Sequence, residues 1–103
     1  MEIVWSQFAE RQLDEIFDYH FHQVSPKVAY RLIIEIINES DKLIKTPYMG
    51  QVEELLKNRS LTYRYFLYKS YKIIYSIDDE NNLIKIADVF DTRQNPTKIK
   101  RST

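Results

Sequence analysis

The hydrophobic residues of this chain change their spacing once, near Leu61, and that change limits the folds open to it. Before Leu61, apolar side chains recur every three or four residues, as they do on one face of an α-helix. After it they recur every second residue, as they do on one face of a β-strand. A helical part followed by a stranded part predicts an α+β domain, in which each part buries the apolar face of the other.

Two helices are predicted in the first part. Ser6 is a typical N-cap, and the apolar stripe after it predicts a helix over about residues 7–22. Ser25-Pro26 marks a second start, and this helix is expected to run to about residue 45. The stripes consist of Ala9, Leu13, Ile16, Phe17 and His20, and of Ala29, Leu32, Ile33, Ile36, Ile37 and Leu43. Because few residues separate the helices, we expect an antiparallel hairpin.

The second part predicts three neighbouring strands, over residues 61–67, 71–77 and 84–87, which are rich in aromatic and β-branched residues. Lys69-Ser70 is a tight connection and residues 78–82 are a polar turn, so these strands should form an antiparallel meander. The predicted fold is therefore an N-terminal strand and an antiparallel helix hairpin packed on a small antiparallel sheet.

Three shorter segments complete the predicted layout. Residues 2–5 should add a strand to the sheet, and a helical turn is possible over residues 52–56. Residues 97–103 form a basic tail, which we expect to be frayed in the isolated chain. With 103 residues, the chain should fold as a single domain over residues 1–103.

Composition narrows the functional classes. The chain has no cysteine, which excludes disulfides and thiol chemistry, and His20 and His22 point to different helix faces, so we expect no metal or cofactor. With no signal peptide and no apolar run of membrane-spanning length, we expect a cytoplasmic protein without membrane contact. Net charge is −3 over residues 1–60 and +3 over residues 61–103. One interpretation is a mildly basic face on the second part of the chain, which would bind nucleic acid or an acidic protein. The other is a chance distribution of charges on a solvated surface.

The candidate site residues lie in the stranded part. Arg64 and Lys72 are expected on outward positions of neighbouring strands, with Asp91 and Arg93 at the end of the last one. Cations clustered there would hold a phosphodiester and stabilise charge on phosphorus. RNA cleavage also needs a general base and acid, and Asp91 or Tyr71 would have to serve. The alternatives are a salt bridge for Arg93 and tyrosines that simply suit a half-buried sheet.

Several segments, in this order and spacing, resemble one family. They are Val4-Trp5-Ser6, Pro47-x-x-Gly50, Tyr63-Arg64, the run Tyr-Lys-Ile-Ile-Tyr at residues 71–75 and the run Val-Phe-Asp-Thr-Arg-Gln-Asn-Pro at residues 89–96. Together they resemble the RelE/ParE toxin superfamily, the toxin halves of bacterial type II toxin–antitoxin modules, often described as plasmid stabilisation proteins. The likeness covers nearly the whole chain, implies the fold predicted above, and is closer to the ParE branch.

The resemblance implies two activities and leaves a third possibility open. The ParE branch is associated with inhibition of DNA gyrase, and a cognate antitoxin neutralises such toxins. The RelE branch consists of ribosome-dependent mRNA endonucleases; by that likeness Arg64, Lys72 and Arg93 would hold the phosphate, with Asp91 or Tyr71 assisting proton transfer. Asp91 stands where many relatives carry histidine, which weakens that role. The third possibility is a non-toxic binding module of the same fold.

The resemblance also implies a protein partner. Antitoxins usually lay an amphipathic helix and an extended segment across the toxin. We expect an apolar groove beside the helix hairpin to receive one, with Phe17 and Phe21 as contacts. For Phe17 the alternative is an ordinary core position, whereas Phe21 lies off the main apolar stripe.

Overall fold

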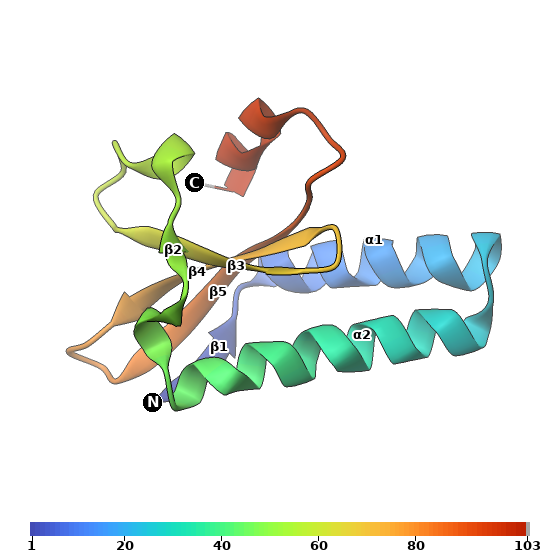
Figure 1. Cartoon of the computed structure of the whole chain (residues 1–103), viewed down its shortest axis with the longest axis horizontal. Coiled ribbons are helices and arrows are strands. Elements are labelled where there is room, and N and C mark those ends of the chain that lie inside the picture. The colour runs from blue at the N-terminus through green and yellow to red at the C-terminus, as the bar shows by residue number, and fades with distance from the viewer. Residues whose placement is uncertain (103) are drawn as a thin grey trace.

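Serine caps start both helices where the sequence predicts them. The structure, a computed structural model, describes residues 1–102. Its helices and strands are β1 (Glu2–Trp5), α1 (Gln7–Gln23), α2 (Pro26–Asp41), β2 (Gln51–Val52), β3 (Tyr63–Tyr68), β4 (Tyr71–Asp78) and β5 (Leu83–Asp91). The Ser6 hydroxyl accepts a hydrogen bond from the Ala9 amide at 3.0 Å, and the Ser25 hydroxyl accepts one from Val28 at 3.1 Å. The two helices run antiparallel, which confirms the predicted hairpin (Figure 1).

Residues 1–102 also contain four 3₁₀ segments, three in connections and one after the last strand. They are η1 (Lys42–Ile44), η2 (Pro47–Met49), η3 (Glu54–Leu56) and η4 (Pro96–Ser102). η1 continues α2 after Asp41, so the α-helix ends earlier than residue 45 although the chain keeps turning. η3 is the helical turn expected near residues 52–56.

The five strands form one sheet in the order β1-β5-β4-β3-β2. β3, β4 and β5 pair antiparallel, as the meander predicted, and β1 joins the far side of β5 in parallel. The sheet is therefore mixed rather than wholly antiparallel. The two-residue strand β2 pairs with β3 and was not predicted, because a two-residue strand leaves no period to detect.

One extra residue in β5 decides which face its last residues occupy. Ile74 of β4 pairs with Asp88, and the next residue, Tyr75, pairs with Ile86. Ala87 of β5 therefore has no pairing partner in β4. This is a β-bulge, and it reverses the alternation beyond it. As a result Val89 and Asp91 face the same side as Ile86, whereas regular alternation would have placed them on the other side.

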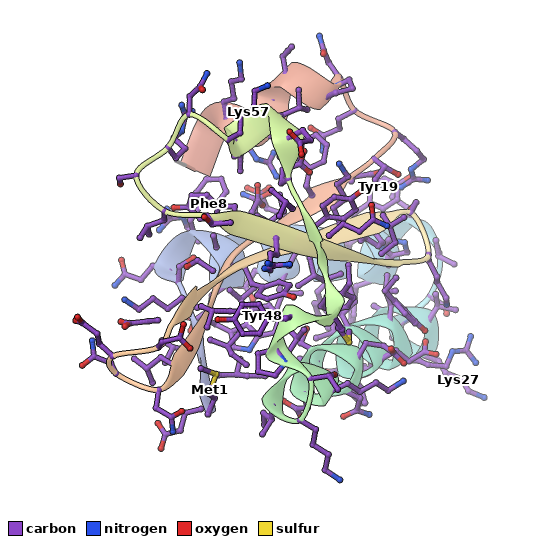
Figure 2. The ribbon with its side chains drawn as sticks, turned by 60° about the vertical axis from the view of Figure 1, so that its left-hand side comes forward. Met1, Phe8, Tyr19, Lys27, Tyr48 and Lys57 are labelled. Atoms are coloured by element: carbon purple, nitrogen blue, oxygen red, sulfur yellow. The ribbon has the colours of Figure 1, made fainter. Side chains whose placement is uncertain are left out.

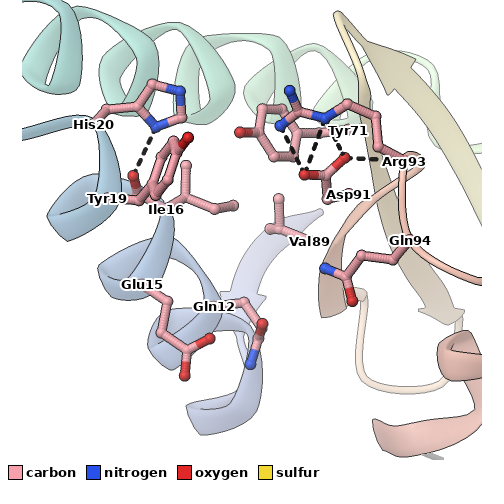
Figure 3. Close-up of a pocket in the computed structure, with 10 residues that line it drawn as sticks. All are labelled: Gln12, Glu15, Ile16, Tyr19, His20, Tyr71, Val89, Asp91, Arg93 and Gln94. Atoms are coloured by element: carbon pink, nitrogen blue, oxygen red, sulfur yellow. Dashed lines mark hydrogen bonds and ion pairs between the residues drawn. The ribbon is translucent and has the colours of Figure 1, made fainter. Parts of the chain in front are cut away.

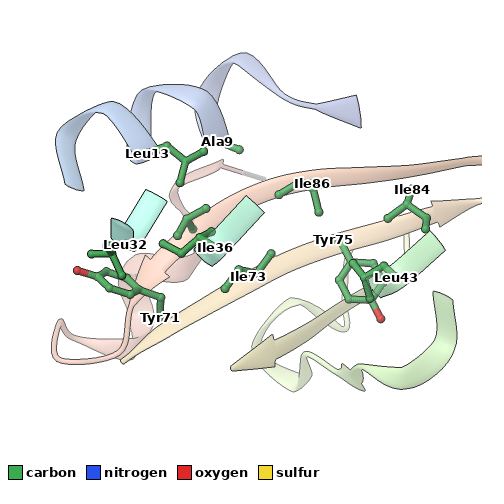
Figure 4. Packing of buried hydrophobic residues seen from close by; sticks show 11 residues of the cluster. Ala9, Leu13, Leu32, Ile36, Leu43, Tyr71, Ile73, Tyr75, Ile84 and Ile86 are labelled. Atoms are coloured by element: carbon green, nitrogen blue, oxygen red, sulfur yellow. The ribbon is translucent and has the colours of Figure 1, made fainter. Parts of the chain in front are cut away.

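The helix hairpin packs on one face of the sheet and forms the larger core (Figure 4). Its buried members are Ala9, Leu13, Leu32, Ile36, Leu43, Tyr71, Ile73, Tyr75, Ile84, Ile86 and Val89. They come from α1, α2, η1, β4 and β5. The helical and stranded parts thus bury each other's apolar faces, as the change in spacing predicted.

The opposite face of the sheet carries a second, smaller core beneath η3 and η4. It consists of Leu56, Ile74, Phe90 and Ile99. The Arg101 guanidinium bonds to the buried carboxylate of Asp88 at 3.2 Å, which ties η4 to β5. The expectation of a frayed tail over residues 97–103 is therefore wrong for residues 97–102, because Ile99 is buried; Thr103 lies outside the described residues.

Candidate functional site

Arg64 and Lys72 lie on opposite faces of the sheet. Arg64 pairs with Tyr75 across β3 and β4, and Lys72 pairs with Leu67. Directly opposed residues of antiparallel strands share a face, and neighbours along a strand alternate. Arg64 therefore shares the helix-covered face with Tyr75, and Lys72 is on the face of the second core. The expectation that these two cations stand together on an outward surface is wrong.

Lys72 is held by a buried carboxylate. Its Nζ lies 2.7 Å from Oε2 of Glu53 and 4.2 Å from the centre of the Tyr65 ring. The Glu53 side chain is only 4% exposed, and its other oxygen accepts from the Leu55 amide at the start of η3. The positive charge of Lys72 is thus neutralised inside the fold, where it anchors the segment before η3 to β4.

Arg64 fastens the loop between α2 and β3. Its Nη1 donates to the carbonyl oxygen of Gly50 at 2.9 Å, and its guanidinium lies 5.0 Å from the centre of the Tyr48 ring. Tyr48, labelled in Figure 2, belongs to η2. The neighbouring Tyr75 hydroxyl accepts from the Gly50 amide at 3.0 Å and donates to the Pro47 carbonyl at 2.7 Å. These contacts assign Arg64 a structural role within the fold.

The other three predicted residues, Tyr71, Asp91 and Arg93, come together at one end of the sheet (Figure 3). Tyr71 at the start of β4 pairs with Asp91 at the end of β5. Arg93 donates to the Asp91 carboxylate, from Nε to Oδ1 at 2.9 Å and from Nη2 to Oδ2 at 2.7 Å. The bulge at Ala87 is what turns Asp91 toward α1 and into this group.

The electrostatics of this group weaken Asp91 as a base. Hydrogen bonds from Arg93 lower the pKa of Asp91 below its ordinary value, so the carboxylate binds a proton poorly near neutral pH. The same contact raises the pKa of Arg93. Burial, with the nearby Asp91 charge, raises the pKa of Tyr71, which keeps the phenol protonated. The group offers hydrogen-bond donors and a fixed cation rather than an obvious general base.

α1 adds residues to this site that the sequence did not single out as functional. A pocket of about 370 Å³ lies between the C-terminal half of α1 and the end of β5. Its lining residues are Gln12, Glu15, Ile16, Tyr19, His20, Tyr71, Val89, Asp91, Arg93 and Gln94. The sequence placed His20 on the apolar stripe of its helix, and His20 is indeed half-buried, with Nδ1 2.8 Å from the Ile16 carbonyl oxygen. Only the knowledge that α1 packs on β5 would have identified His20 as part of this site.

A separate apolar groove of about 410 Å³ runs along the outer side of the helix hairpin. Its apolar residues are Leu13, Phe17, Tyr30, Ile33, Ile34 and Ile37, and Glu10 and Asp14 add negative charge. Tyr30 and Ile34 are more than half exposed. Phe17 lines the groove, and its ring centre lies 5.0 Å from that of Tyr30. The ring centre of Phe21 lies 5.5 Å from that of Phe17. Both predicted phenylalanines thus belong to one aromatic cluster at the hairpin.

The described residues show neither a membrane span nor a metal centre. No helix within residues 1–102 combines the length and apolar character needed to cross a bilayer. Within the same residues, histidine, aspartate and glutamate side chains do not gather in groups of three that could hold a metal ion.

A helix hairpin packed on a five-stranded sheet that includes the N-terminal strand β1 defines a small α+β toxin fold of the RelE/ParE type. The family model described as "ParE toxin of type II toxin-antitoxin system, parDE" matches residues 3–96. The chain therefore belongs to the ParE toxin family, as its sequence motifs predicted.

Solved structures agree on the fold. A chain from the structure entitled "Chromosomal ParDE TA system from P. aeruginosa" superposes with a TM-score of 0.72 at 16% sequence identity. The superposition covers 88% of this chain and 95% of that one. No curated protein sequence matches the chain.

Proposed function

We propose that this protein is the toxin of a type II toxin–antitoxin module, that it inhibits DNA gyrase in the cytoplasm, and that a cognate antitoxin neutralises it. Membership of the ParE toxin family over residues 3–96 carries this proposal. The exposed apolar groove on the helix hairpin supports the antitoxin part, because large apolar patches on small proteins commonly mark protein partners.

The groove suits one amphipathic helix of the antitoxin. Its floor presents Phe17, Tyr30 and Ile34 to the apolar face of such a helix, and Phe21 extends the aromatic surface at one end. Glu10 and Asp14 in the groove carry negative charge, so the partner helix should bear lysine or arginine beside its apolar stripe.

The arrangement of cations argues against the endonuclease alternative. Lys72 is neutralised by Glu53, Arg64 lies on the other face, and Arg93 is engaged with Asp91. A ribonuclease needs several cations directed at one phosphate together with a free base and acid. Tyr71, Asp91 and Arg93 form the only part of the predicted set that the structure brings together, and Asp91 is occupied there.

Two assays separate the possible functions. Purified protein is added to DNA gyrase in a supercoiling assay, and mRNA cleavage is followed on translating ribosomes. We expect inhibited supercoiling without cleavage, relieved by the product of a small antitoxin reading frame adjacent to the gene. Ribosome-dependent cleavage would instead establish the endonuclease. Unaffected gyrase, intact mRNA and normal growth of an expressing host would identify a non-toxic module.

A further inference from the structure

Tyr71 is largely buried, and its hydroxyl group has no hydrogen-bond partner among residues 1–102. The residue as a whole is 4% exposed, and within residues 1–102 no group donates to or accepts from its hydroxyl. Figure 3 shows the hydroxyl on the side of the ring that faces Tyr19 and His20. Tyr71 lines two pockets, and its hydroxyl is not among the fully buried atoms that lack a partner, so it is available to a ligand there.

A second unpartnered polar atom borders the same space. Oε1 of Glu35 is buried and lacks a hydrogen bond among residues 1–102, although Lys69 Nζ lies 3.6 Å away. Glu35 and Tyr71 both line a pocket of about 170 Å³ between α1, α2 and the turn that joins β3 to β4. One buried, unsatisfied carboxylate oxygen and one unbonded tyrosine hydroxyl line this pocket, which indicates that it receives a polar molecule.

The charges around this pocket favour an anion. Arg31 of α2, Lys69 of the β3–β4 turn and Arg93 after β5 reach it from three different elements. Against them stand Glu35 in the pocket and Asp91, which accepts from Nε and Nη2 of Arg93; Nη1 has no hydrogen bond to any of residues 1–102. Positive charge exceeds negative charge there, and cationic donors from three elements line one small space.

Glu35 discriminates among anions. The Tyr68 hydroxyl, with Lys69 nearby, lowers the pKa of Glu35, so the carboxylate stays ionised and can only accept hydrogen bonds. Sulfate and carboxylate ligands carry no proton to give it at neutral pH. A phosphate monoester has its second pKa at about 6, so about a tenth of its molecules retain a P–O–H at pH 7. That hydroxyl can donate to Glu35 while the remaining oxygens accept from Tyr71, Lys69 and Arg31.

We propose that this pocket binds the phosphate of a small phosphate monoester, whose organic group occupies the adjoining pocket at the end of β5. The two pockets share His20, Tyr71 and Arg93, so a single ligand can span them. The adjoining space of about 370 Å³ offers the Tyr19 ring and the amide of Gln94. An aromatic face with polar edges suits a nucleobase, which makes a 5′-mononucleotide the best matched monoester.

Chemical-shift titration of the wild-type protein tests the proposal. The probes are inorganic phosphate, 5′-AMP, adenosine and sulfate. We expect phosphate to move the amide signals of residues 69–71 and 93, with sulfate about tenfold weaker because it lacks the donor for Glu35. 5′-AMP should bind about tenfold more tightly than phosphate by using the second pocket. Adenosine alone should bind weakly.

Two variants sharpen the result. Glu35→Gln supplies an amide that can donate as well as accept, so it should abolish the preference for phosphate over sulfate. Tyr71→Phe should weaken phosphate and 5′-AMP about tenfold, whereas the control variants Tyr63→Phe and Lys45→Ala should leave both unchanged. Equal binding of phosphate and sulfate by the wild-type protein, or pocket signals that no probe moves, would overturn the proposal without any variant.

Discussion

Nζ of Lys72 lies 2.7 Å from the buried carboxylate of Glu53, and this ion pair gives the lysine a structural role in the sheet. In the endonuclease interpretation the same lysine would have to face a phosphate. A lysine that leaves Glu53 would strand an unpaired charge in the protein, which is strongly unfavourable. Moving Lys72 toward a phosphate would therefore lower the stability of the folded chain.

Removal of the Glu53 carboxylate should destabilise the protein. Glu53→Ala leaves Lys72 partly buried without a partner and also removes the acceptor for the Leu55 amide. We expect the free energy of unfolding to fall by about 2 kcal/mol, somewhat below the range for a fully buried pair because Lys72 is partly exposed. Urea denaturation measures the loss. The neighbouring exposed substitution Glu54→Ala is the control, and equal stability of the two variants would refute this role.

Gly50 should tolerate no side chain. A Cβ atom there would lie 2.5 Å from the Tyr75 hydroxyl and 2.7 Å from the Tyr65 carbonyl oxygen. Because the second atom belongs to the backbone of β3, a shift of side chains cannot relieve it. Gly50→Ala is expected to cost about 2–3 kcal/mol of unfolding free energy. In a Tyr75→Phe background the cost should fall but persist, and its disappearance would show that only the hydroxyl is in the way.

Arg93 should control the titration of Asp91. In Arg93→Ala the carboxylate loses the three hydrogen bonds from the Arg93 side chain and keeps the one from the residue 93 backbone amide, so the pKa of Asp91 should rise toward its ordinary value. The pKa is lowered in the folded wild-type protein, so its contribution to stability is present above the unfolded pKa and is lost as pH falls through the folded one. The stability difference between the two proteins should therefore shrink in acid.

Carboxyl NMR titration follows that change directly. Asp78 is the internal control, because its lowered pKa comes from Asn81 and not from Arg93. If the Asp91 signal titrates identically in wild type and Arg93→Ala, the Arg93 side chain is not the cause of the lowered pKa of Asp91.

The hairpin groove should be the antitoxin site. Ile34 is 55% exposed in the groove, and Ile34→Asp places a charge where an apolar helix face is expected to pack. Antitoxin affinity should fall by about 2 kcal/mol, or roughly thirtyfold. Isothermal titration with the adjacent gene's product measures it. Asn38→Asp adds the same charge on the same helix outside the groove lining, and similar affinities for the two variants would exclude the groove.

Local signals in the sequence were enough for the helices and the meander. Ser6 and Ser25 cap as their positions predicted, and alternation near Leu61 located the strands. Such features depend on neighbours along the chain, so they survive without knowledge of the tertiary structure. The burial of Ile99 depends instead on a pocket made by Leu56, Ile74 and Phe90, which no local pattern in a basic tail reveals.

The site was harder to predict because it depends on strand register. The sequence did contain one usable signal: with Lys69-Ser70 as a two-residue turn, Tyr68 pairs with Tyr71, and residues 64 and 72 must then face opposite sides. No comparable signal announces the bulge at Ala87, which brings Asp91 to the side of α1. Sequence reasoning thus found the residues at the end of β5 but not the helix that completes their pocket.

The unpaired Ala87 has a consequence for comparing members of this fold. Two homologous chains can align letter for letter through the motif at residues 89–96 and still present those side chains to opposite layers, if only one of them has the extra residue in β5. A residue's role at this strand end should then be transferred between relatives only after the hydrogen-bond pairing of β4 with β5 has been matched. Here a single backbone insertion, rather than the identity of any side chain, sets the chemistry available on each surface.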